Sequence, residues 1–168
     1  MLNVDTFVGS DASFMSSAHL ISGERDAILV DASFAKSDAQ QLAQLVKRSG
    51  KRLTSIFITH PHPDHFLGLP VVVETFPEVR VIATAAVADA MRSAAPDYHA
   101  TYALVFGDAL ADTYVVAEPL IESELSLEGE TIRVIEIGPG EADVSSALYF
   151  PSLKAIATGD QIFNRVHV

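Results

Sequence analysis

The chain has 168 residues, a formal net charge of −11 and a hydrophobic fraction of 49%. This length is typical of one domain with a sizeable core, and we expect residues 1–168 to form a single domain. The acidic balance argues against nucleic-acid binding as the main activity, because contact with a phosphate backbone needs clustered lysine and arginine.

The sequence also bears on compartment and on ligand chemistry. It contains no cysteine, so disulfides and thiolate metal ligands are impossible. No apolar stretch approaches the length of a membrane span, which argues against a membrane partner. Residues 1–5 lack the basic region of a secretory signal, and we expect a cytoplasmic protein.

Strands and helices are expected to alternate through the first part of the chain. Short runs of β-branched and apolar residues, bounded by turn residues, predict strands at residues 18–21, 27–30, 52–59 and 79–83. This alternation indicates an α/β fold.

Helices are predicted between these strands from apolar residues at helical spacing. The first is expected to have Ser37 or Asp38 as its N-cap and to end near Gly50. Pro96 is expected to break a later, alanine-rich helix, and residues 97–118 to add one or two further helices.

A histidine-rich cluster follows the strand at residues 52–59. It has the pattern HxHxDH and consists of His60, His62, Asp64 and His65. His60 and His62 each precede a proline, which favours extended backbone, and side chains two apart on extended backbone point the same way. The two imidazoles can therefore converge on one ion.

Asp64 and His65 stand at the expected start of a helix that runs through residues 66–76. There they can turn back to face a second ion. Imidazole and carboxylate ligands suit zinc, iron or manganese. The alternative, a solvated loop that happens to be rich in histidine, is disfavoured by the strand, the prolines and the helix that frame the cluster.

The last part of the chain is rich in expected strands, at residues 122–127, 131–137, 147–150 and 155–157. A glycine-rich turn occupies residues 138–143, and Gly159-Asp160 closes the last strand. Turns at strand ends can bring carboxylates to a metal, although either turn alone is a weak signal.

Together these residues resemble the metallo-β-lactamase superfamily of metallohydrolases. The resemblance rests on HxHxDH at residues 60–65, on Leu29-Val30-Asp31 before it, and on Gly138-Pro139-Gly140 and Gly159-Asp160 after it. It covers nearly the whole chain. It implies an αββα sandwich, in which two sheets lie face to face with helices outside and a metal site at one edge.

The resemblance also implies roles for individual residues. His60 and His62 would bind the first metal, Asp64 and His65 the second, and Asp160 would bridge the two. Two zinc ions are expected, with iron or manganese as alternatives. A metal-bound hydroxide would attack an ester-like carbonyl, and Asp64 would act as a catalytic residue that orients the nucleophile or passes its proton to the leaving group.

One departure from the superfamily concerns the third ligand of the first metal. The superfamily usually has a histidine after Pro-Gly, whereas Pro139-Gly140 is followed here by Glu141. Glutamate can ligate zinc, so Glu141 is a candidate ligand, and Asp143 could compete for the role. The alternative is that Glu141 is a turn carboxylate beside an altered site.

The other departure concerns length. Members of the superfamily normally continue past the Gly-Asp strand to a last histidine, whereas only His167 follows Asp160 here. We expect this sequence to be truncated at its C-terminus, with His167 a weak candidate for a ligand or substrate contact. If it is complete, the exposed sheet favours a homodimer.

These observations predict a metal-dependent hydrolase of ester-type bonds, acting on a small-molecule ester, lactone, thioester or β-lactam. The alternatives are a catalytically impaired metal-binding or interaction module and a phosphodiester hydrolase, which the acidic balance argues against. The resemblance places Phe14, Met15 and Phe34 near the mouth of the site, where they could contact an apolar acyl group or serve ordinary loop packing.

Three further side chains could line that pocket from the helices in the middle of the chain: Tyr98, His99 and Tyr102. Partial exposure on a helix face is the simpler interpretation for them. His19 lies in an apolar strand and is expected to be a core histidine.

Overall fold

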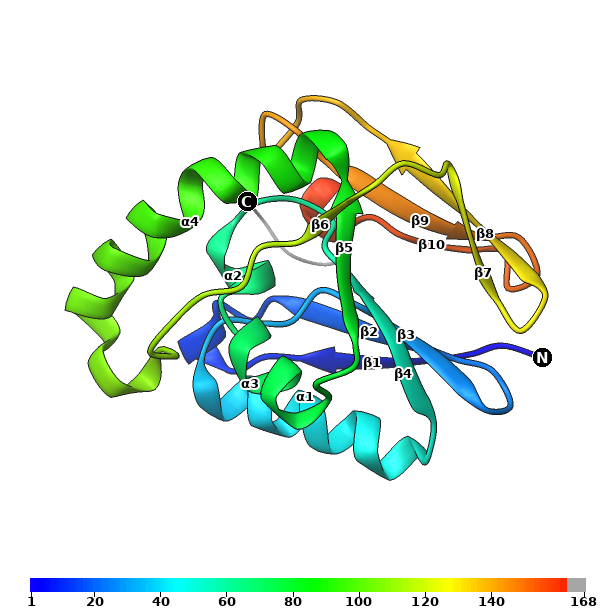
Figure 1. Ribbon diagram of the computed structural model, residues 1–168, viewed down its shortest axis with the longest axis horizontal. Coiled ribbons are helices and arrows are strands. Elements are labelled where there is room, and N and C mark those ends of the chain that lie inside the picture. Colours follow the sequence, from blue (N-terminus) through cyan, green and yellow to red (C-terminus); the bar gives the residue numbers. More distant parts are fainter. Residues whose placement is uncertain (163–168) are drawn as a thin grey trace.

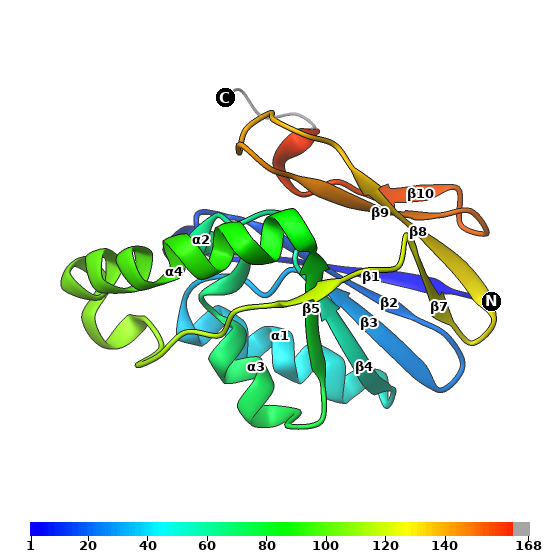
Figure 2. The ribbon, with the colours of Figure 1, turned by 45° about the horizontal axis from the view of Figure 1, so that its top comes forward.

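The computed structural model describes residues 1–162, which form two β-sheets that face each other (Figures 1 and 2). The six-stranded sheet has the spatial order β1 (Asn3–Val8), β2 (Ser17–Ser22), β3 (Asp26–Val30), β4 (Arg52–Phe57), β5 (Arg80–Thr84) and β6 (Glu118–Leu120). The four-stranded sheet has the order β10 (Ala155–Ala157), β9 (Ser146–Phe150), β8 (Glu130–Glu136) and β7 (Glu124–Leu127).

The strands from β3 to β6 are parallel, and all other pairings are antiparallel. The helices are α1 (Lys36–Ser49), α2 (Pro63–Phe66), α3 (Leu69–Thr75) and α4 (Ala85–Phe106). In Figure 2, α1 and α3 lie on the side of the larger sheet that faces away from the smaller sheet. α2 and α4 follow the carboxyl ends of β4 and β5.

The central strands are buried on both faces. In β3, Leu29 packs into the core under the helices, whereas Ile28 and Val30 pack into the core between the two sheets. Ile56 and Phe57 in β4 divide in the same way. Strands covered on both faces carry continuous apolar runs, which explains why residues 27–30 lack a polar alternation. The expected sandwich is confirmed.

No described helix is both long enough and apolar enough to cross a membrane.

The prediction that Pro96 ends a helix is wrong, because α4 runs through it from Ala85 to Phe106. Proline removes one backbone hydrogen bond, that to the carbonyl of Arg92. Arg92, Ser93 and Pro96 are all exposed, so water can solvate this carbonyl. After α4 the chain forms the strand β6 at Glu118–Leu120, which the sequence did not predict.

The helix expected at residues 66–76 is divided in two. α2 ends at Phe66 and α3 begins at Leu69, with Gly68 between them. A Cβ atom on Gly68 would lie 2.3 Å from the carbonyl oxygen of Ala32. This close approach packs the segment that contains the HxHxDH cluster against the loop that follows β3.

Candidate functional site

The HxHxDH segment lies directly after β4, where the chain leaves the sheet. His62 has φ −77° and ψ 143°, which is the extended backbone expected before Pro63. His60 and His65 are fully buried, whereas His62 keeps 28% of its side chain exposed. The segment therefore presents two buried imidazoles and a third one at the surface.

His60, His62 and Glu141 form one group whose ligand atoms all lie within 4.8 Å of one another. Glu141 comes from the loop between β8 and β9, in the other sheet. Its Oε1 atom lies 2.8 Å from Nδ1 of His62, and its Oε2 atom lies 3.5 Å from Nε2 of His60. The structure therefore places Glu141 beside the paired histidines.

His60, His65 and Asp160 form a second group with the same spacing. Nε2 of His65 lies 3.4 Å from Oδ1 of Asp160 and 3.4 Å from Oδ2 of Asp64. The rings of His60 and His65 are 4.1 Å apart, so the two groups adjoin and share His60. The sequence did not predict this sharing.

The donor atoms fit a metal ion. Nε2 of His60 and Nε2 of His65 are both buried and lack a hydrogen-bond partner among the described residues. An unpaired buried nitrogen is costly. A metal surrounded by imidazole nitrogens and carboxylate oxygens would satisfy both atoms.

Hydrogen bonds at the far side of each ring hold these nitrogens in place. Oγ1 of Thr59 donates to the Asp31 carboxylate and lies 2.9 Å from Nδ1 of His60, so it can accept the proton of that nitrogen. Nδ1 of His65 lies 2.9 Å from Oδ2 of Asp31 and donates to it. With Nδ1 of each ring turned to these partners, Nε2 of His60 and Nε2 of His65 both face the carboxylates and are the nitrogens that could bind a metal.

Asp31 and Thr59 were not predicted as site residues. Asp31 is only 2% exposed and has φ 61°, a left-handed conformation that is strained for a residue other than glycine. It also accepts a hydrogen bond from the backbone N–H of Thr59. A charged residue directly after the buried strand β3 was the signal available in the sequence.

The pKa values of the histidines separate in this environment. Burial and the nearby His65 lower the pKa of His60 to about 4, so this imidazole is neutral at pH 7. Burial also lowers the pKa of His65, but Asp31, Asp160 and Asp64 outweigh it and raise the value well above the ordinary range. Three carboxylates thus favour a positive charge at this position, which a proton or a metal can provide.

The two carboxylates beside Nε2 of His65, those of Asp64 and Asp160, are held ionised. Burial raises the pKa of Asp64 and of Asp160, yet the interaction with His65 is stronger, and both pKa values lie below the ordinary range. Ionised carboxylates are the form that ligates metals.

Close backbone approaches bring Asp160 to the histidines. Gly159 has φ 54°, and a Cβ atom there would lie 2.4 Å from Oγ1 of Thr59 and 3.0 Å from Nδ1 of His60. Ser146 of β9 donates from its N–H and its hydroxyl to the carbonyl of Thr59. The smaller sheet is thus fastened to the histidine segment.

The remaining candidates lie apart from both groups. Asp143 is exposed and belongs to neither of them. His19 is half-buried and hydrogen-bonds with Thr6, and His99 hydrogen-bonds with the carbonyl of Ala111. His167 lies outside the described residues.

A cavity of about 290 Å³ opens beside the site. It is lined by His62, Asp64, Pro63, Phe14, Tyr98 and Tyr102. Burial raises the pKa of Tyr98, and the proximity of Tyr102, Glu141 and Asp64 raises it further, so its hydroxyl stays protonated.

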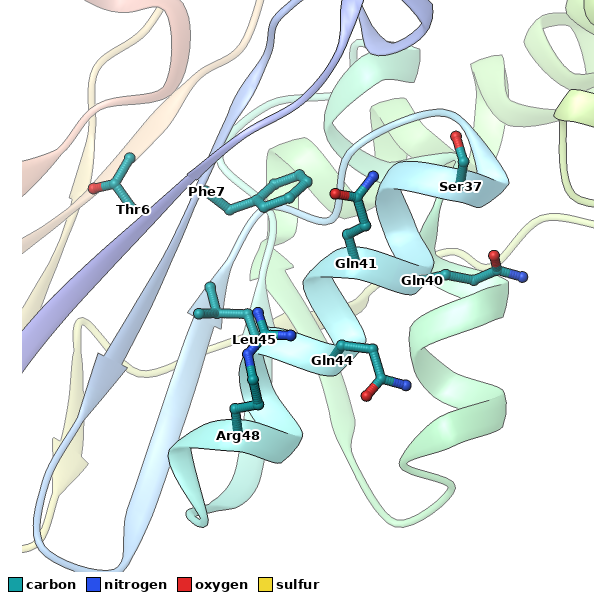
Figure 3. Close-up of a pocket in the computed structure, with 8 residues that line it drawn as sticks. All are labelled: Thr6, Phe7, Ser37, Gln40, Gln41, Gln44, Leu45 and Arg48. Atoms are coloured by element: carbon teal, nitrogen blue, oxygen red, sulfur yellow. The ribbon is translucent and has the colours of Figure 1, made fainter.

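A larger cavity of about 730 Å³ lies between β1 and α1 (Figure 3). Its walls are mainly amide and hydroxyl side chains from α1, together with Phe7 and Arg48. None of its lining residues belongs to a metal group, so the smaller cavity is the candidate for substrate.

The comparisons with known proteins agree with this geometry. The family model described as "Metallo-beta-lactamase superfamily" matches residues 13–168. The uncharacterized protein YobT of Bacillus subtilis (strain 168) is 34% identical over 71 residues, which is 42% of this chain and 30% of YobT.

Solved structures share the fold. BLEG-1 B3 metallo-beta-lactamase has a TM-score of 0.69 at 20% identity, covering 98% of this chain and 74% of its own. The metallo-beta-lactamase family protein TTHA1429 from Thermus thermophilus has a TM-score of 0.68 at 20% identity, covering 98% and 60%. A HARLDQ-motif mutant of a metallo-beta-lactamase from Cronobacter sakazakii has a TM-score of 0.59 at 25% identity, covering 79% and 52%. The chain thus spans between about a third and three quarters of the lengths of these proteins.

Proposed function

Because the chain belongs to the metallo-β-lactamase superfamily, we propose that it is a metal-dependent hydrolase that cleaves an ester-type bond of a small molecule. The observation that carries this proposal is the pair of buried, unpartnered Nε2 atoms on His60 and His65, which face carboxylates on both sides. Burying these nitrogen atoms and carboxylates together costs free energy unless a cation binds between them.

We assign the first metal position to His60, His62 and Glu141, and the second to His65, Asp64 and Asp160. Zinc suits both sets, with iron or manganese as alternatives. A divalent metal bound by these residues would supply a Lewis acid, which would make a water molecule more acidic and a carbonyl group more reactive.

The protein's own groups complete the reaction. Asp64 lines the cavity, so its carboxylate can exchange a proton with a molecule bound there. It also lies 3.4 Å from Nε2 of His65. The water oxygen bonds to the carbonyl carbon, and the bond from that carbon to the leaving oxygen breaks. Asp64 accepts the proton from water and donates it to the leaving oxygen, which yields a carboxylic acid and an alcohol.

Metal analysis combined with substrate assays tests this function. Purified protein is expected to contain zinc, iron or manganese and to hydrolyse members of a panel of chromogenic esters, lactones and a cephalosporin. His60→Ala should lose metal and activity together, whereas the control His19→Ala should retain both, because His19 lies on β2 outside the metal groups. Failure to bind any of the three metals on titration contradicts the proposal.

A second candidate is a metal-binding module without hydrolytic activity. Glu141 favours it, because a carboxylate ligand adds negative charge and weakens the ion as a Lewis acid. Bound metal with no turnover of any panel member would support this candidate over the hydrolase.

A further inference from the structure

The lining of the cavity beside the site combines two kinds of side chain. His62 and Asp64 belong to the proposed metal site, whereas Phe14, Tyr98 and Tyr102 are aromatic. A molecule that places a reactive bond beside His62 and Asp64 within this cavity therefore has aromatic side chains around its adjoining group.

The aromatic side chains form a packed wall. The ring of Phe14 contacts Tyr102 edge to face at 6.4 Å, and Tyr98 lies 6.4 Å from Tyr102. Phe34, which is fully buried, supports Phe14 at 5.3 Å and Tyr102 at 5.2 Å. Phe106 packs behind them, 4.9 Å from Phe34. Interlocked rings lose little further freedom when a ligand binds.

The backbone is bent to expose part of this wall. Phe14 and Met15 have φ values of 55° and 56°, in the left-handed region that residues with a Cβ atom rarely adopt. The two side chains are nevertheless 50% and 63% exposed. Strained backbone that holds large apolar side chains at the surface beside a site indicates a role in binding.

We propose that the cavity binds an apolar acyl side chain, so that the preferred substrates are esters or lactones of aromatic or aliphatic acids. This inference rests on the proposed function for the identity of the cleaved bond. The aromatic wall selects the side chain.

A pair of esters with the same leaving group tests the aromatic wall in the metal-loaded full chain. The pair is p-nitrophenyl phenylacetate and p-nitrophenyl acetate, which differ only in the acyl group. Phe14→Ala and Tyr98→Ala should each lower kcat/KM for the phenylacetate by about tenfold and that for the acetate by less than twofold. Leu104→Ala, on the exposed face of the same helix as Tyr98, should change neither.

Equal losses on both esters, or no loss on either, would overturn the proposal. Thermal unfolding of each variant identifies any loss that comes from misfolding, and Tyr98→Ala replaces Phe14→Ala if the latter does not fold. Binding of the uncleaved amide phenylacetamide, followed by ligand-observed NMR, gives a readout without turnover. Binding that Tyr98→Ala abolishes, in a protein that cleaves no ester, would contradict the proposed hydrolase and retain the apolar pocket.

Discussion

Oε1 of Glu141 lies 2.8 Å from Nδ1 of His62, so a carboxylate from one sheet meets an imidazole that follows a strand of the other sheet. The same carboxylate lies 3.5 Å from the buried Nε2 atom of His60. Asp143, two residues further along, is exposed and takes no part in either metal group. Glu141 is therefore the acidic residue placed to complete a set of three ligands.

Glu141→Gln is expected to weaken binding of the first metal by about tenfold or more, because the variant keeps the shape of the side chain but loses its charge. Glu141→His should restore a neutral ligand and lower the pH at which hydrolysis reaches half its maximum. Chelator competition and metal content measure the first effect, and a pH–rate profile the second.

Asp143→Asn is the matched control, since it removes one negative charge from the same loop. It should leave metal affinity unchanged. If Glu141→Gln and Asp143→Asn change metal affinity equally, Glu141 is only a turn residue. That result would favour the second candidate, a metal-binding module without hydrolytic activity.

Features that depend on residues close together in the sequence were predicted well. The HxHxDH spacing and the prolines indicated that His60 and His62 share a direction, and the extended backbone of His62 agrees with this. Gly50 ends α1 in the left-handed conformation, as expected for a glycine at that position. These features depend on neighbours a few residues away.

Features that depend on tertiary contacts were harder to predict. The N-cap of α1 is Ala35 instead of Ser37 or Asp38. Asp38 accepts two hydrogen bonds from Ser10, which is 28 residues earlier. The part that Asp31 plays depends on two loops that meet beyond the carboxyl ends of β3 and β4. Local pattern carries no information about such partners.

Asp31→Asn is expected to lower metal affinity by about 10- to 100-fold. The amide is a weaker acceptor and can present its NH₂ group to His65, so Nδ1 of that imidazole loses the partner that keeps it protonated. Titration of metal-free protein with zinc measures the change.

Asp38→Asn is a fitting control, because Asp38 is also a buried carboxylate that accepts hydrogen bonds from a loop. It should cost stability without altering metal affinity. Wild-type affinity in Asp31→Asn would mean that Asp31 supports only the fold.

Gly159→Ala is expected to destabilise the protein by about 2–4 kcal/mol, since it adds a left-handed alanine and a collision with Thr59 and His60. Gly50→Ala isolates the first of these costs, about 1–2 kcal/mol, because nothing lies within 4 Å of a Cβ atom there. Urea unfolding of both variants measures the difference. Only Gly159→Ala should also weaken metal binding, and equal behaviour of the two variants would show that the close approach to His60 has no consequence.

Glu128, in the turn between β7 and β8, joins the two sheets. Its carboxylate accepts hydrogen bonds from the backbone N–H groups of Glu24, Arg25 and Asp26, in and just after the turn between β2 and β3. These hydrogen bonds lower the pKa of Glu128 from 4.5 to about 2, and the bond from Arg25 has the largest effect. Because the ionised form of Glu128 makes these hydrogen bonds only in the folded protein, ionisation of this carboxyl group stabilises the folded state.

Because the pKa is lower in the folded protein, this stabilisation is complete above pH 4.5 and is lost as the pH falls through the folded pKa of about 2. Glu128→Gln keeps the size of the side chain but cannot ionise. The variant should therefore be less stable than the wild type at pH 7, and the difference in unfolding free energy should disappear between pH 4.5 and about 2.

Urea unfolding of both proteins across this pH range measures the difference. The control is Glu122→Gln, which changes an exposed glutamate in the loop before β7 and keeps the contribution of Glu128. A difference that stays constant with pH would mean that the carboxylate contributes through its shape and not through its charge.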